Sequence, residues 1–584
     1  MTWWEDHPGR LELELEALDQ AGITYTIDQA ATIAGVLVLH LQIEVDAVEL
    51  DLDAHFPDLY PWFRVEVSAP DIELDHHQHG LGKNLCLLPR GTENWHPETL
   101  LAELLAEQLP IVLRAAEEGA GTPLEDPQAE PISEYFACQP NAAIVVDGSM
   151  SIGDADAGTF EVAIISEPGQ PLRGVVNTVK DATGSIIGRV DPGLERHLSV
   201  TTKMAGKWAR CPVPPGAFGD AQVLRNALRP ILNLKSVPYT GGRNRPHGEL
   251  LAAIFEEEHA WPAASGTGWI FIHTPTNRPA DGPHTTYVRA TRGGHADLQY
   301  RSTNRNLLAD KTVVVVGLGS LGLPILLGLG QAGVGNLRYV DHKFVEPGIT
   351  TRTGYHYFQF GLAKVQAATD LLGAVAPFVD ARGVHLRIGS PSTPYQPRQQ
   401  DILADLFTGA DLLIDATAER GVQAFTSYQA AQRRIPHIVT SATPGGWGGT
   451  VGVFLPDSTL GCAVCWLWAR EDDDTLNPPA MLNGHVQPPA CADVTFIGEG
   501  ADLATIANQT IRTATQLLAG SARPTWNVAT CDLVDPATGE PTLPTWTQHA
   551  VPPHPGCRCG RQVPAASCPT PATGDSHTRL AGPR

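Results

Sequence analysis

The sequence predicts a multidomain protein with an N-terminal α+β domain, a β-rich middle domain and a C-terminal α/β domain built on a mostly parallel sheet. The chain has 584 residues, more than one hydrophobic core accommodates. Strand and helix patterns alternate from about residue 301 onward. The clearest pattern is an apolar run, Thr312–Val316, followed by Gly317-x-Gly319-x-x-Gly322 and a second strand that ends at Asp341. That order is typical of a nucleotide-binding βαβ unit.

The first domain is expected to span residues 1–120. Apolar residues recur there with helical spacing in two segments and alternate as in strands in three. The predicted helices cover residues 9–20 and 97–108, and the predicted strands cover 23–28, 35–45 and 63–67. Residues 121–131 are rich in Gly, Pro and acidic residues and are predicted to be a linker.

The middle domain, residues 132–300, shows short β-rich runs around one predicted helix at 221–234, and no motif assigns it a chemistry. The α/β domain is expected to cover residues 301–560 and to contain an irregular crossover loop at about 466–497. Residues 561–584 are rich in Pro, Ala, Gly and Ser and are predicted to form a mobile tail.

Charge and hydropathy exclude two classes of partner. The chain carries 40 basic and 64 acidic residues, a net charge of -24, without the basic stripe that nucleic-acid binders show. The most apolar stretch, residues 312–335, contains seven glycines and a proline, so a strand, turn and helix explain it better than a membrane span. The N-terminus shows no secretory signal pattern. We therefore expect a cytoplasmic protein that binds neither nucleic acid nor membrane.

The glycine motif alone leaves an NAD-dependent oxidoreductase open as an alternative, and the residues downstream favour an ATP site. Glycines allow a tight turn near a phosphate, and the acidic Asp341 suits a ribose. Arg352, Lys364 and Asp415 then follow, the last at the end of an apolar strand. When a carboxylate attacks the α-phosphorus of ATP, fixed cations and a metal ion stabilise the growing negative charge. Hydride transfer needs no such cations.

In that order and spacing, residues 304–518 resemble the adenylation domain of the ThiF/MoeB and ubiquitin-activating superfamily. The resemblance implies a Rossmann-like domain that uses ATP and Mg²⁺. It also implies a role for each motif residue, listed here in chain order: Arg305 as a further phosphate arginine, in some relatives for the partner subunit; Gly317, Gly319 and Gly322 in the turn; Asp341 at the ribose; Arg352 and Lys364 at the phosphates; Asp415 at Mg²⁺. The family's Asn and Gln are replaced here by Ile349 and Thr353.

Cysteines supply two further expectations. Cys491 lies in the predicted crossover loop, where relatives keep a thioester cysteine. A loop allows the thiolate to reach an acyl adenylate, and a following helix N-terminus lowers a thiol pKa. The superfamily also often holds a structural Zn²⁺ with two cysteine pairs, here Cys462 with Cys465 and Cys557 with Cys559. Because the second pair is C-x-C, His554 and Cys568 remain alternatives for the fourth ligand.

The front domain resembles a ubiquitin-conjugating domain. The resemblance is carried by Tyr60-Pro61, by the tripeptide His76-His77-Gln78 ten residues before Cys86, and by Trp95 two residues before Pro97. It implies that Cys86 accepts an acyl group as a second thioester. The family's Asn, which stabilises the oxyanion, is Gln78 here, and a longer amide can still donate a hydrogen bond.

Together the two resemblances predict a relay in which a protein C-terminus is adenylated, passed to Cys491, then to Cys86, and finally to an amine on a target. The domain order resembles fusions in bacterial CBASS antiphage operons, where a cyclic-oligonucleotide synthase is the acyl donor; a ubiquitin-like protein is the other candidate. Sulfur-carrier activation for cofactor synthesis and a noncatalytic scaffold that binds a C-terminal peptide with nucleotide remain alternatives. Superfamily members commonly dimerise, so we expect a homodimer.

Overall fold

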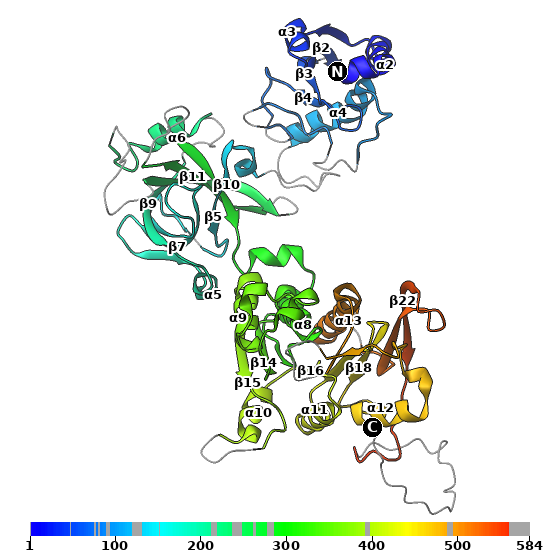
Figure 1. Ribbon diagram of the computed structural model, residues 1–584. Coiled ribbons are helices and arrows are strands. Elements are labelled where there is room, and N and C mark those ends of the chain that lie inside the picture. The colour runs from blue at the N-terminus through cyan, green and yellow to red at the C-terminus, as the bar shows by residue number, and fades with distance from the viewer. Residues whose placement is uncertain are drawn as a thin grey trace, which may run out of the picture. The chain divides into compact units, whose positions relative to one another are not determined.

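The computed structural model describes residues 2–46, 48–74, 77–79, 82–88, 94–118, 131–150, 152–211, 219–235, 248–260, 264–276, 285–391, 397–487, 494–521 and 523–559. It divides the chain into two compact units, residues 1–190 with 198–297, and residues 191–197 with 298–584. The first unit contains two separate sheets, and the second contains one large sheet and a two-stranded ribbon (Figure 1). None of the described helices combines the length and apolar character needed to cross a membrane.

The N-terminal sheet is an antiparallel meander of four strands: β1 (Thr24–Ile27), β2 (Leu37–Val45), β3 (Val48–Phe56) and β4 (Glu66–Ser68). Its helices are α1 (Trp3–Asp6), α2 (Pro8–Gln20), α3 (Gln29–Ile33) and α4 (Leu101–Glu118). Helix α4 starts and ends later than the predicted 97–108, with Pro110 inside it. Glu14 of α2 is buried, pairs with Arg10 at 2.8 Å and accepts the amide of Leu101 at 2.8 Å. This carboxylate therefore joins the two long helices.

The middle sheet closes on itself. Strand β5 (Cys138–Val146) pairs with both β12 (Thr286–Arg292) and β7 (Arg173–Asp181). The ring is completed by β11 (Ala264–Thr274), β10 (Glu249–Ala260), β9 (Thr202–Arg210) and β6 (Ala157–Ile164), and β8 (Ile186–Arg189) attaches to β7. Closure gives every strand of the ring two neighbours, so it removes exposed edges. The predicted β-rich character is confirmed, and the helix is α6 (Ala221–Leu228), shorter than expected.

The C-terminal sheet has eight strands in the order β15-β14-β13-β16-β17-β18-β21-β22. The first five are parallel and the last three antiparallel. In that order the strands are β15 (Asp380–His385), β14 (Asn336–Asp341), β13 (Thr312–Val316), β16 (Leu412–Asp415), β17 (His437–Ala442), β18 (Gly448–Phe454), β21 (Val528–Val534) and β22 (Pro541–His549). The central strand β13 is a Thr-Val-Val-Val-Val run that is buried throughout, as parallel strands covered on both faces require.

Helices cover both faces of this sheet (Figure 1). One face packs against α8 (Gly322–Ala332), α9 (Lys364–Val375) and α13 (Gly500–Leu518), and the other against α10 (Gln399–Phe407) and α11 (Arg420–Arg433). A Cβ on Gly328 would lie 2.4 Å from Ile511, and one on Gly330 would lie 2.6 Å from Leu372. These glycines let α13 and α9 approach α8 closely. The predicted βαβ unit, β13-α8-β14, is confirmed.

Candidate nucleotide-binding site

Three motif segments meet at the carboxyl edge of the parallel strands. In register, Val316 at the end of β13 lies opposite Val340 of β14 and Asp415 of β16. The turn beginning at Gly317 is therefore flanked by Asp341 on one side and by the end of β16 on the other. In the sheet, β14 and β15 lie on one side of β13. The chain then crosses back, so that β16 lies on the other side of β13. Such a reversal leaves a crevice, which is where ligands bind in sheets of this kind.

The glycine turn fits the close approach of a phosphate. Gly317 has φ +90°, and a Cβ there would lie 3.0 Å from the Thr417 methyl. A Cβ on Gly322 would lie 1.8 Å from the carbonyl oxygen of Gly317, so only glycine fits. Gly319 by contrast faces open space. Helix α8 begins without a side-chain cap, and its positive dipole end favours an anion, although the Leu323 amide donates to the Gly319 carbonyl at 3.2 Å and Pro324 has no amide hydrogen.

Asp341 holds the turn in shape. Its carboxylate accepts the amides of Leu318 and Lys343, each at 2.7 Å. The buried hydroxyl of Tyr355 donates to the carbonyl of Leu318 at 3.1 Å, and burial raises the pKa of Tyr355. No sequence motif marks this tyrosine, because its contact is made with a backbone carbonyl. The turn is therefore fixed from both sides.

Two cations lie at the same edge. Lys364 opens α9 and is only 6% exposed, and Arg352 is half-buried. Burial lowers the pKa of Lys364, an effect that Asp341 partly offsets and that Arg352 and Lys343 reinforce. Burial also lowers the pKa of Arg352. Within the described residues neither side chain forms an ion pair, so the edge carries positive charge that a polyphosphate can neutralise.

Arg352 contacts a distant segment of the chain. Its guanidinium donates to the carbonyl of Phe496 at 2.6 Å and to the hydroxyl of Thr495 at 2.9 Å. Both residues belong to β20 (Thr495–Phe496), which pairs with β19 (His485–Val486). Three groups of β20 contact the guanidinium: the Phe496 carbonyl, the Thr495 hydroxyl and the Phe496 ring. All three are neutral.

Asp415, predicted to hold Mg²⁺, is fully buried. One carboxylate oxygen accepts the amide and the hydroxyl of Thr417, at 3.0 and 2.7 Å, and the other accepts the hydroxyl of Thr426 at 2.8 Å. Burial raises the pKa of Asp415 although these hydrogen bonds oppose the shift. As placed, this carboxylate shapes the strand end and does not fit an accessible Mg²⁺ site. We derive no step through Mg²⁺.

Arg305, expected to be a further phosphate arginine, lies away from the glycine turn of its own chain. It lies on α7 (Arg305–Leu308) and donates to the carbonyl of Gln331 at 3.1 Å, beside Gly333 at the C-terminal end of α8. The glycine turn lies at the other end of this 11-residue helix, about 16 Å away. Within one chain Arg305 therefore caps α8 and does not reach the phosphates of its own site.

The four predicted metal-binding cysteines come together. The sulfur atoms of Cys462 and Cys465 are 3.7 Å apart, those of Cys462 and Cys557 3.7 Å, and those of Cys465 and Cys559 3.6 Å. All four sulfurs lie within 4.8 Å of one another. Tetrahedral ligands at about 2.3 Å from a zinc ion are about 3.8 Å apart, so this arrangement fits such an ion.

His554 does not belong to this cluster. Its ring bonds Asp472 at 3.1 Å and stacks on Trp468. Cys568, the other alternative ligand, lies outside the described residues.

Of the two predicted thioester cysteines, the structure describes Cys86. Cys491 lies outside the described residues, as does His76. Cys86 is half-buried, and its amide donates to the carbonyl of His77 at 2.7 Å. The neighbouring Gln78 is 7% exposed; its amide nitrogen donates to the carbonyls of Ala69 and Ile72, at 3.0 and 3.1 Å.

The sequence left open whether Gln78 takes the oxyanion role at Cys86, and its placement does not fit that role. Its side-chain oxygen accepts the amide of Leu74 at 2.9 Å, so both ends of the side chain bind backbone groups. As placed, Gln78 braces a turn and offers no hydrogen to an oxyanion.

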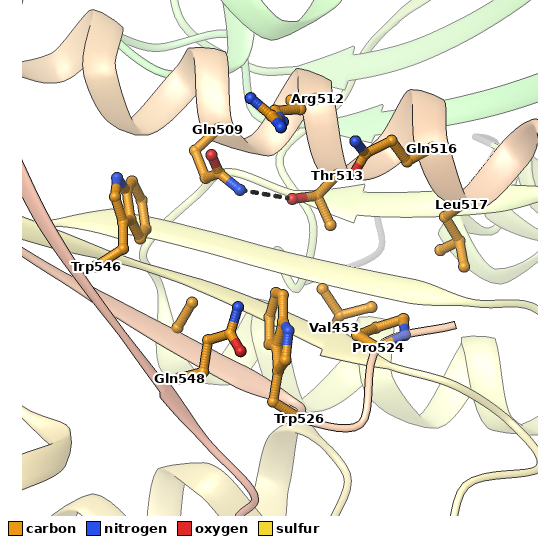
Figure 2. Close-up of a pocket in the computed structure, with 11 residues that line it drawn as sticks. Val453, Gln509, Arg512, Thr513, Gln516, Leu517, Pro524, Trp526, Trp546 and Gln548 are labelled. Carbon is orange, nitrogen blue, oxygen red and sulfur yellow. Dashed lines mark hydrogen bonds between the residues drawn. The ribbon is translucent and has the colours of Figure 1, made fainter. Parts of the chain in front are cut away.

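A cavity of about 340 Å³ lies in the same unit, away from the glycine turn (Figure 2). Figure 2 shows Gln509 and Thr513 of α13 pointing toward Trp526 and Trp546. The first lining residue of α13 is nine residues beyond Gly500, about 14 Å along the helix from the end that contacts Arg352. The cavity is separate from the crevice at the glycine turn.

The fold and this edge define a nucleotide-binding α/β domain with one buried and one half-buried cation beside a glycine turn. Residues 298–537 match the ThiF family. The C-terminal part of the chain is therefore a ThiF family domain, homologous to adenylyltransferases. This confirms the resemblance stated for residues 304–518.

Relatives of two kinds are found. Two proteins of Sinorhizobium fredii, the uncharacterized proteins y4oA and y4qC, are 27% and 29% identical over 96% and 94% of this chain, and over 98% and 97% of their own lengths. The probable adenylyltransferase/sulfurtransferase MoeZ of Mycobacterium tuberculosis is 29% identical over 33% of this chain and 44% of its own. Among solved structures, E. coli MccB with ATP covers 44% of this chain and 68% of its own at 14% identity, with a TM-score of 0.33.

Gly319→Ala and Gly322→Ala are expected to separate folding from nucleotide binding. The alanine methyl at 322 meets the Gly317 carbonyl at 1.8 Å, so this variant should lose about 1–3 kcal/mol of stability. The methyl at 319 enters open space, so that variant should fold normally and bind ATP about tenfold more weakly. Thermal unfolding and calorimetric ATP titration measure the two effects, with Gly9→Ala as the control. Normal ATP affinity in Gly319→Ala would contradict a phosphate at this turn.

The affinity for ATP is expected to fall with rising pH before an ordinary lysine, with its pKa of 10.5, would lose its proton. The lowered pKa of Lys364 means that its proton leaves earlier, and phosphate binding requires the charged form. Calorimetric titrations between about pH 7 and 10 should show the loss for ATP, whereas adenosine, which lacks phosphates, should show none. Lys364→Arg should hold its ATP affinity to higher pH. A wild-type ATP affinity that is constant over this range would contradict the assignment.

Proposed function

We propose that the chain activates a carboxylate at the C-terminus of a protein with ATP. The observation that carries this is a pair of cations, the buried Lys364 and the half-buried Arg352, beside a glycine turn and a helix N-terminus without a side-chain cap. A carboxylate oxygen attacks the α-phosphorus of ATP, and pyrophosphate departs. Negative charge grows on the phosphate oxygens during this step, and the two cations and the positive dipole end of α8 stabilise it. Homology of the domain to adenylyltransferases supports the same reaction.

The proposal continues as a relay through two cysteines. The thiolate of Cys491 attacks the acyl carbon and releases AMP, and the thiolate of Cys86 then displaces Cys491. An amine on a target attacks the second thioester, which forms an amide and frees the Cys86 thiol. The arrangement of Gln78 requires that the oxyanion of this last step be stabilised by another donor. Tethering two thiols in one chain raises their effective concentration.

The setting we propose is bacterial antiphage defence in the cytoplasm, with a homodimer as the active form and a cyclic-oligonucleotide synthase or a ubiquitin-like protein as acyl donor. Sulfur-carrier activation is the second candidate. It is favoured by the similarity to MoeZ and to the E. coli sulfur carrier protein ThiS adenylyltransferase, which is 26% identical over 29% of this chain and 63% of its own length. That function requires neither Cys86 nor the front domain.

The relay is tested with wild type, Cys86→Ala and Cys491→Ala, each co-expressed with neighbouring genes. Nonreducing electrophoresis and intact mass should show an ATP-dependent adduct that reductant removes. In Cys86→Ala the adduct should remain on Cys491, whereas Cys491→Ala should form none. A wild-type adduct that is found on Cys491 alone and never on Cys86 would favour sulfur-carrier activation. Nucleotide binding without any adduct would favour the noncatalytic scaffold.

We also propose that the four-cysteine cluster holds a structural Zn²⁺. The purified chain should contain about one equivalent of zinc, and a chelator should lower its unfolding temperature, because the metal binds the folded state. Cys465→Ser should lose the metal, whereas Cys138→Ser, a half-buried cysteine outside the cluster, should keep it. Metal analysis and thermal unfolding provide the measurement. A metal-free chain whose stability ignores the chelator would contradict the proposal.

A further inference from the structure

The strand β20, near the end of the predicted crossover loop, contacts the arginine predicted to bind phosphate. We infer that Thr495 and Phe496 are positioning residues, which hold the guanidinium of Arg352 in place for the phosphates of ATP. This inference rests on the proposed function and deepens it. The two residues lie 143 and 144 positions after Arg352, and no motif marks them.

The contacts orient the guanidinium without neutralising it. One terminal nitrogen donates to the Phe496 carbonyl at 2.6 Å, the other donates to the Thr495 hydroxyl at 2.9 Å, and the Phe496 ring lies 5.0 Å from the guanidinium carbon. An arginine has five N–H donors, so three remain for a ligand. A carboxylate partner would cancel the charge, whereas a carbonyl, a hydroxyl and a ring face leave it available to an anion.

The strand that supplies these contacts is itself anchored. His485 and Val486 of β19 pair with Phe496 and Thr495 of β20. Ile497 follows, and its amide donates to the carbonyl of Gly484 at 2.6 Å while its carbonyl accepts the amide of Gly445 at 2.7 Å. The guanidinium is therefore held by a fixed element.

Arg352 is restrained on its backbone side as well. A Cβ added to Gly500, the first residue of α13, would lie 3.3 Å from the Arg352 Cα, so the helix start lies close to the arginine backbone. An arginine loses much side-chain entropy when a ligand orders it, and an arginine that is already ordered loses less. Contacts with β20 that order Arg352 before ATP binds should therefore increase the affinity for the ATP phosphates.

Thr495→Val removes the hydroxyl acceptor at nearly constant shape, and Thr495→Ser retains it. We expect Thr495→Val to weaken ATP binding by about fivefold to tenfold, since one hydrogen bond to a charged group is lost. Adenosine affinity should not change, because adenosine has no phosphate. Thr495→Ser should bind ATP as wild type does, and so should Thr505→Val, the control on α13. Calorimetric titration with ATP and with adenosine measures both affinities.

A double-mutant cycle with Arg352→Ala separates positioning from general damage. If Thr495 acts through Arg352, Thr495→Val should have no further effect on ATP affinity in the Arg352→Ala chain. Equal losses for ATP and adenosine, or additive effects in the cycle, would overturn the inference while leaving the proposed function intact. A wild-type chain that binds neither ATP nor adenosine would overturn the proposed function, and the inference with it. Phe496→Leu, which removes the ring face, provides a second variant with the same expected pattern.

Discussion

The candidate site depends on two cations, the buried Lys364 and the half-buried Arg352, that form no ion pair within the described part of the chain. Desolvation makes such charges costly, so a folded chain tolerates them where other groups hold them in place and where a ligand returns the lost solvation. Neutral acceptors hold Arg352, and the fixed start of α9 holds Lys364. The close packing of α8 against α9 and α13, made possible by Gly328 and Gly330, is what brings these elements to the glycine turn. The site is thus a consequence of how three helices share one face of the sheet.

The sequence predicted the parts of this site that are local. A β-branched run, a glycine turn and an acid at the end of the next strand are adjacent in the chain, so their spacing carries the geometry. The four-cysteine cluster was predicted from two short pairs, although their sulfurs join residues up to 95 positions apart. What the sequence did not show are contacts made through backbone carbonyls, such as those of Tyr355 and Arg352. A carbonyl is present at every residue and so leaves no compositional trace.

The same limit explains the corrections. Asp415 was assigned a role from its position in a motif, whereas the oxyanion role of Gln78 was left open. In the structure each is buried and hydrogen-bonded on both ends of its polar group, Gln78 by backbone and Asp415 by two threonines. Burial of this kind depends on neighbours that the motif does not include. The sequence also did not predict that the middle sheet closes. Closure requires β5 to pair with two strands, β7 and β12, that lie far apart in the chain.

The two cations of the site bear on the choice among the candidate functions. An oxidoreductase binds a dinucleotide whose charge lies at the helix N-terminus, and two further buried cations would remain uncompensated in it. A noncatalytic scaffold would gain nucleotide affinity from the cations. It would not gain a lower reaction barrier in exchange for the free energy that their burial costs. In adenylation, negative charge grows on the phosphate oxygens as the reaction proceeds. A fixed cation beside those oxygens stabilises the transition state more than the bound substrate and so lowers the barrier. The charge balance of this edge therefore favours catalysis at the α-phosphorus, whatever group later receives the acyl chain.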